Sequence, residues 1–168
     1  MLPVKHVDFY YDFSCPYAYL ASCRVEAIAR AHGATLALCP MLLGGVFRAI
    51  GTGDGPMKTL GPAKLAHNAA DMHRWAARLG VPFRVPAGHP MRTVQALRVL
   101  LGLPREVWSD AMHALYAAYW QRGEDIARDE VIETALAETK SLSACCDPVA
   151  RSANCSACCT KIWHATPD

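Results

Sequence analysis

The chain has 168 residues, of which 52% are apolar and 19% are charged, and its formal net charge is +2. This length suits one domain with its own core, and the charge is too small for the basic surface by which proteins bind nucleic acid. The first residues lack the basic stretch and apolar run of an export signal, and no segment reaches the roughly 18 uninterrupted apolar residues of a membrane span. We therefore expect a cytoplasmic protein that uses neither nucleic acid nor a membrane as partner.

The first quarter of the chain predicts a β-α-β unit. Residues 7–13 are rich in aromatic and β-favouring side chains and suit a short buried strand. Residues 16–32 show helical spacing, with Pro16 at the first helical position and Gly33 as a stop. Residues 35–43 suit a second strand, which such a crossover makes parallel to the first. Four side chains share the expected core face of the helix: Leu20, Cys23, Ala27 and Ile28.

The middle of the chain predicts helices and no further strands. They are expected over residues 63–79, 93–101, 106–121 and 129–138. The first follows a flexible loop at residues 51–56 and ends before Gly80, and Asp129 is expected to cap the last. This order indicates an α/β fold in which a helical insertion, about residues 45–138, follows the β-α-β unit, while the strands that would complete the sheet are missing.

The pattern changes abruptly at residue 139. Residues 139–168 have no periodicity and contain five of the eight cysteines, namely Cys145, Cys146, Cys155, Cys158 and Cys159. Cys155 and Cys158 have the spacing of zinc ligands, yet we predict no metal site and interpret 139–168 as an irregular tail after one domain of residues 1–138. A shifted reading frame or a divergent end produces such a loss of pattern, so we hypothesise a truncated chain. Sequencing the encoding DNA past this point tests that hypothesis.

Cys15 is the residue in the first half that carries the clearest chemical signal. It lies between a predicted strand and the first residue of a helix, where unpaired N–H groups stabilise an anion and can lower a cysteine pKa from about 8.5. We therefore predict a reactive thiolate, with a buried structural cysteine as the alternative. Ala18 stands where a resolving cysteine would be needed, so any redox chemistry uses a single thiol. We predict that Cys23 and Cys39 are core residues.

The segment VDFYYDFSCPYAYLA at residues 7–21 resembles the opening of 2-hydroxychromene-2-carboxylate isomerases. The resemblance continues through residues 49–51 and 64–83, including DMHRWA at 71–76, and covers roughly residues 5–138. These enzymes belong with kappa-class glutathione transferases in the DsbA-like thioredoxin superfamily. The resemblance implies a thioredoxin-like β-α-β unit interrupted by a helical domain, with glutathione as cofactor at the start of the first helix.

The resemblance also implies a set of site residues. The family usually has a serine before the proline, whose hydroxyl bonds the glutathione sulfur; here that position holds Cys15, and Ser14 lies one residue earlier. Three roles for Cys15 are open: partner to the glutathione thiolate, which the family favours, site of a mixed disulfide, or nucleophile. Lys64 matches a basic residue that contacts glutathione, or is a solvated helix charge. Thr52 stands where relatives commonly have asparagine near the substrate, or has no role. The predicted site is therefore catalytic Cys15, with Ser14, Pro16, Lys64 and Thr52 binding the cofactor.

The function implied by the resemblance is a glutathione-dependent isomerisation in aromatic catabolism. Ring opening and cis/trans isomerisation proceed through a glutathione adduct, from which the thiol is regenerated. Two alternatives are kept: a monothiol protein disulfide oxidoreductase or kappa-like glutathione transferase, and an inactive truncated remnant. The expected partners are glutathione and a small aromatic substrate, and a homodimer is one option for the oligomeric state.

Overall fold

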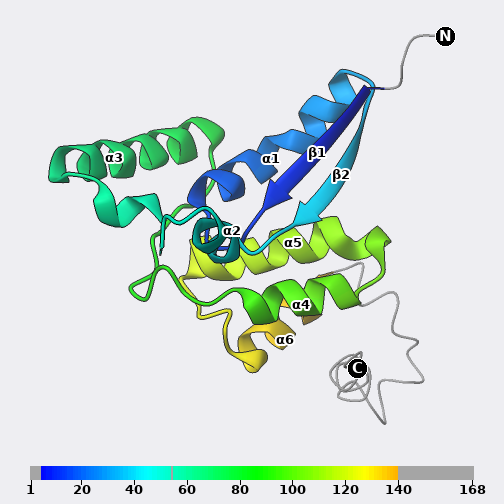
Figure 1. Cartoon of the computed structure of the whole chain (residues 1–168). Coiled ribbons are helices and arrows are strands. Elements are labelled where there is room, and N and C mark those ends of the chain that lie inside the picture. Colours follow the sequence, from blue (N-terminus) through cyan, green and yellow to red (C-terminus); the bar gives the residue numbers. More distant parts are fainter. Residues whose placement is uncertain (1–4, 54, 140–168) are drawn as a thin grey trace.

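The computed structural model of the chain describes residues 5–53 and 55–139 (Figure 1). Its β-α-β unit consists of β1 (Lys5–Tyr11), α1 (Pro16–Ala31) and β2 (Ala34–Pro40). The further α-helices are α2 (Leu43–Ala49), α3 (Pro62–Leu79), α4 (Val94–Gly102), α5 (Trp108–Tyr116) and α6 (Asp129–Ala137). Short 3-10 turns form η1 (Pro56–Thr59) and η2 (Arg105–Val107), and a π-helical turn, η3 (Ala117–Arg122), continues α5. No helix within these described residues is long and apolar enough to cross a membrane.

The predicted parallel β-α-β unit is confirmed, with shifted strand ends. β1 and β2 pair in parallel, and Phe9 lies opposite Leu38. β1 ends at Tyr11, two residues earlier than predicted, because the chain turns at once: the Cys15 N–H donates to the Asp12 carbonyl oxygen at 3.0 Å. α1 begins at Pro16, as predicted. The predicted stop is also confirmed: α1 ends at Ala31, followed by the cap His32 and by Gly33, which has a φ of 61°.

The predicted core face of α1 is only partly correct. Leu20 is buried, but Cys23 and Ala27 are exposed and Ile28 is 48% exposed. The helix instead turns a neighbouring face inward, with Ala18, Tyr19, Ser22 and Ala29 buried. This rotation follows from Tyr19, whose ring packs on the rings of Tyr116 and Trp120. The prediction that Cys23 is a core residue is therefore wrong, whereas Cys39 is half-buried.

The helical region follows the predicted order with three local differences. The first is α2, which was not predicted. α3 ends before Gly80, which has a φ of 66°, as predicted. The single helix predicted over 106–121 is instead divided into η2, α5 and the π-helical turn, whose hydrogen bonds join residues five apart and not four apart. Asp129 was predicted as the N-cap of α6, but it is the first helical residue. Arg128 occupies the N-cap, and no side-chain hydrogen bond caps the helix. The predicted capping role of Asp129 is therefore wrong.

Aromatic rings form the centre of the core, where the β-α-β unit meets α5 and η3. Tyr11 and Phe13 from the end of β1 pack against Tyr116, and Tyr119 and Trp120 lie next to them in the π-helical turn. All five side chains are buried, and the Tyr11 hydroxyl has no hydrogen-bond partner among the described residues. The segment after β1 therefore rests directly on the most tightly buried part of the chain. The division at residue 138 stays a prediction, and the cysteine-rich segment with its zinc-like spacing lies outside the described residues.

Two neighbouring leucines of α4 offer a matched test of this core. Leu100 is fully buried, and Leu101 is 55% exposed. We expect Leu100→Ala to lower the free energy of unfolding by about 2–5 kcal/mol, because it leaves a cavity among the core side chains. Leu101→Ala removes the same side-chain atoms from the same helix and should lower the free energy of unfolding by less than about 0.5 kcal/mol. Urea unfolding followed by circular dichroism measures both, and equal losses would contradict the assigned core.

Candidate functional site

Cys15 is the N-cap residue of α1 and is half-buried against the aromatic core. Its side chain makes no capping hydrogen bond, although the nearby backbone N–H groups of Ala18 and Tyr17 lower the pKa of its thiol. Burial is the largest influence and raises that pKa, and the charge of Asp12 raises it further. The net effect is a raised pKa. The expected lowering of the pKa is therefore wrong, because desolvation outweighs the helix N-terminus, and the group is a thiol at neutral pH.

Ser14 directs its hydroxyl inward, to the buried carboxylate of Asp12. The Ser14 Oγ donates to Asp12 Oδ1 at 3.1 Å, and the Ser14 N–H donates to the same oxygen at 3.0 Å. The hydroxyl proton is thus already used within the turn. Contact between Ser14 and glutathione stays a prediction, and the side chain at the N-cap itself is Cys15.

Two side chains from the helical region hold the carbonyl groups of this turn. The Tyr116 hydroxyl donates to the Asp12 carbonyl oxygen at 3.3 Å, and the Trp120 Nε1–H donates to the Phe13 carbonyl oxygen at 2.8 Å. Sequence reasoning missed Asp12, Tyr116 and Trp120 as parts of the site. Asp12 carried one usable signal, since an acidic residue directly after a buried strand needs hydrogen-bond donors close by.

Pro16 and Lys64 belong to two helices, α1 and α3, that contact each other. Pro16 is the first helical residue and has no N–H, so Tyr17 and Ala18 supply the first free N–H groups. The Tyr17 hydroxyl lies 3.5 Å from Asp71 Oδ2 of α3. Lys64 lies seven residues before Asp71, hence on the same face of α3 and about 10 Å farther along its axis. It is exposed, so its role as a glutathione contact stays a prediction.

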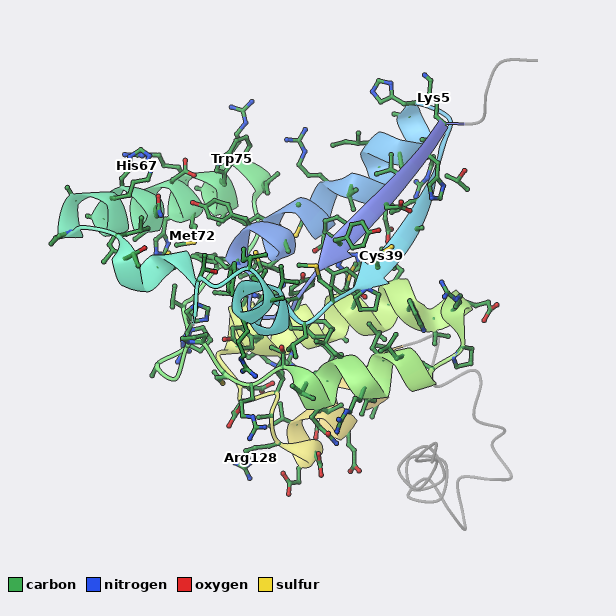
Figure 2. All side chains as sticks on the ribbon, viewed as in Figure 1. Lys5, Cys39, His67, Met72, Trp75 and Arg128 are labelled. Atoms are coloured by element: carbon green, nitrogen blue, oxygen red, sulfur yellow. The ribbon has the colours of Figure 1, made fainter. Side chains whose placement is uncertain are left out.

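Figure 2 shows how α3 extends from the rest of the chain beside the start of α1. Met72 is buried on the side of α3 that faces the other helices, whereas Trp75 is exposed on the outer side (Figure 2). The contact between α3 and α1 is therefore made near the middle of α3, and its N-terminal turn, which carries Lys64, lies open beyond that contact.

Thr52 lies in the loop after α2 and closes the end of that helix. Its N–H and its Oγ1 both donate to the carbonyl oxygen of Phe47, at 2.9 Å and 3.1 Å. The side chain is exposed and its proton is used locally. This geometry accounts for a threonine here without any ligand, and the predicted cofactor contact of Thr52 stays a prediction.

The family described as DSBA-like thioredoxin domain matches residues 6–143. The chain belongs to this family. A 2-hydroxychromene-2-carboxylate isomerase from Pseudomonas putida is 32% identical over 123 residues, which are 73% of this chain and 59% of that protein. Glutathione S-transferase kappa 1 of Caenorhabditis elegans is 28% identical over 142 residues, which are 77% of this chain and 60% of the relative.

A solved structure of a 2-hydroxychromene-2-carboxylate isomerase superposes on the chain with a TM-score of 0.65 at 25% identity, covering 94% of this chain and 79% of the other. The α/β, thioredoxin-like fold class and the resemblance to this group of proteins are thereby confirmed. The chain nevertheless spans only about three fifths of the length of the two curated relatives just described.

The raised pKa of Cys15 predicts how its alkylation depends on pH. Below that pKa, the rate of reaction with iodoacetamide should rise about tenfold per pH unit, because only the thiolate reacts. Mass spectrometry of the peptide that contains Cys15 measures the rate at each pH. In denaturant the same residue should reach its plateau at lower pH, because burial is lost. A rate that is flat between about pH 6 and pH 8 would show a thiolate and contradict the geometry.

Proposed function

We propose that the chain is a glutathione-dependent isomerase of the 2-hydroxychromene-2-carboxylate type, acting on a small aromatic substrate. The observation that carries this proposal is the place of the Cys15 side chain at the N-cap of α1, beside the N–H groups of Tyr17 and Ala18. Membership of the DsbA-like family and the identity to an isomerase from Pseudomonas putida support the reaction class. The match to a kappa-class glutathione transferase supports glutathione as the thiol.

The start of α1 suits a bound thiolate by the chemistry of its donors. Pro16 occupies the first helical position, so the free N–H groups of Tyr17 and Ala18 and the positive end of the helix dipole attract an anion placed beside Cys15. The glutathione sulfur is such an anion when ionised. Bound there, glutathione would supply the thiolate that adds to the conjugated substrate. Elimination after the isomerisation would release the thiol again, so glutathione is not consumed.

Cys15 has three open roles, and its protonation state favours one of them. A thiol whose pKa is raised by burial is a poor nucleophile at neutral pH and a slow partner in disulfide exchange. It does carry an S–H group that donates a hydrogen bond. We infer that Cys15 donates to the glutathione sulfur, in the position where the family usually has a serine hydroxyl.

Lys64 and the loop after α2 complete the proposed cofactor site. Lys64 lies on the face of α3 that meets α1, about two helical turns from Asp71. Its exposed ammonium attracts a carboxylate of glutathione. Ser14 and Pro16 contribute to glutathione binding through the shape of the turn. Thr52 contributes through its position in the loop after α2. The kappa-like transferase is the second candidate function, since a kappa-class enzyme is among the relatives.

The cellular setting and the assembly are proposed on separate grounds. Cys15, Cys23 and Cys39 are free thiols among the described residues, as is usual for proteins of the reducing cytoplasm, where we place the chain. Val7 and Tyr10 leave apolar side chains exposed on β1, which supports a homodimer as the assembly. Sedimentation velocity with and without glutathione tests the dimer.

Two substitutions of Cys15 separate the hydrogen-bond donor from the nucleophile. Cys15→Ser keeps a donor and should retain isomerase activity within about tenfold, whereas Cys15→Ala should lose at least about tenfold, the cost of one lost hydrogen bond to an ion. The change in substrate absorbance with glutathione present measures the rate. Cys23→Ser, on the exposed side of the same helix, is the control. Equal loss in both Cys15 variants would show that the sulfur itself reacts.

The contribution of Lys64 is measured by binding alone. Lys64→Ala should weaken glutathione binding by about two- to fivefold, as expected for one exposed ion pair, and added salt should reduce the difference. Calorimetry with the purified chain gives both constants. Arg98→Ala removes an exposed cation from α4 and should leave binding unchanged. A Lys64→Ala variant that binds like the parent chain would assign Lys64 to the solvated surface.

A further inference from the structure

The carboxylate of Asp12 joins two elements that are far apart in the sequence. Oδ1 accepts hydrogen bonds from the N–H and hydroxyl of Ser14, and Oδ2 accepts one from the N–H of Leu43, 31 residues later, at 2.7 Å. Leu43 is the first residue of α2, and its N-cap, Leu42, has no side-chain oxygen to offer. Asp12 therefore supplies the acceptor that a capping residue normally provides from within the chain.

The main chain of Asp12 holds Cys15 in place as well. Its carbonyl oxygen accepts from the Cys15 N–H at 3.0 Å and from the Tyr116 hydroxyl at 3.3 Å. The side chain is 1% exposed, and a carboxylate this deeply buried keeps its geometry because loss of any donor leaves a lone pair without a partner. One residue thus connects the thiol-bearing turn, the start of α2 and α5.

We propose that Asp12 is a positioning residue, whose carboxylate fixes the turn at Ser14 against α2 and thereby sets the place and accessibility of the Cys15 sulfur. Its effect on catalysis rests on the proposed function, whereas its effect on the sulfur does not. The substituted chains are therefore examined first by a chemical reaction of Cys15 that needs neither glutathione nor substrate.

Two variants remove the same hydrogen bond from opposite ends. Asp12→Asn keeps one oxygen for the two Ser14 donors but turns an NH₂ group toward the Leu43 N–H. Leu43→Pro deletes that N–H while leaving the carboxylate intact. Proline suits the first residue of a helix, and Leu42 before it is already extended, with φ −89° and ψ 99°. Leu43→Ala controls for the lost leucine side chain, and Asp8→Asn for the loss of one carboxylate from β1.

The measurement is the rate at which iodoacetamide alkylates Cys15 at one pH, divided by the rate at the exposed Cys23 of the same chain. We expect about a tenfold rise in this ratio for Asp12→Asn and for Leu43→Pro, as the loosened turn uncovers the sulfur, and changes within about twofold for both controls. Because the two variants break one shared bond, the double variant should lie within about threefold of either single variant.

An unchanged ratio in both single variants overturns the proposal, and so does a double variant whose effect is the product of the two. Loss of the far-UV circular dichroism signal in Asp12→Asn would signal general unfolding. In that case Leu43→Pro and Ser14→Ala, which retain the buried carboxylate, test the proposal by the same alkylation ratio.

Isomerase assays of the same variants are a second experiment: kcat should fall about tenfold, with KM within about twofold. A parent chain without isomerase activity would reject the proposed function and leave the alkylation result standing.

Discussion

The hydrogen bond from the Trp120 indole N–H to the Phe13 carbonyl oxygen connects the two parts of the molecule on which the site depends. It joins residues 107 positions apart, and the Tyr116 hydroxyl makes a parallel connection to Asp12 across 104 positions. Both donors belong to buried aromatic side chains of α5 and η3. A sheet of two paired strands holds few backbone hydrogen bonds, so these aromatic anchors define the turn that follows β1.

Cys15 shows how two ordinary effects compete at the same atom. The helix N-terminus favours a charged sulfur, and contact with the aromatic core disfavours it; burial wins. A turn buried less deeply would carry a thiolate and would suit disulfide exchange. The same backbone with a covered sulfur suits hydrogen-bond donation. The difference between the two chemistries thus lies in the packing under the turn, which the residues around Cys15 in sequence do not reveal.

Much of the fold could be predicted from local patterns, because they are set by neighbours along the chain. Pro16 and Gly33 mark the ends of the helix in the β-α-β unit, and Gly80 ends α3 by adopting a positive φ. α2 was missed because its start depends on the carboxylate of Asp12, 31 residues away. The predicted burial of Cys23 was wrong for a related reason. Residue spacing defines the faces of a helix, but contact with the distant Tyr116 decides which face of α1 is buried. Tyr116 and Trp120, which hold the carbonyl groups of the Cys15 turn, are distant in sequence and leave no local signal.

The buried hydroxyl of Tyr11 has a consequence for how freely the chain can vary. Within the part of the chain that the structure describes, this oxygen has no hydrogen-bond partner, and burial together with Cys39 raises the pKa of the group. Its ring, by contrast, packs on Phe9, Phe13 and Tyr116. A phenylalanine would retain those ring contacts and would remove a desolvated polar atom, so selection for stability alone would not preserve the tyrosine. Position 11 is therefore a place where the chain can gain stability by losing an atom.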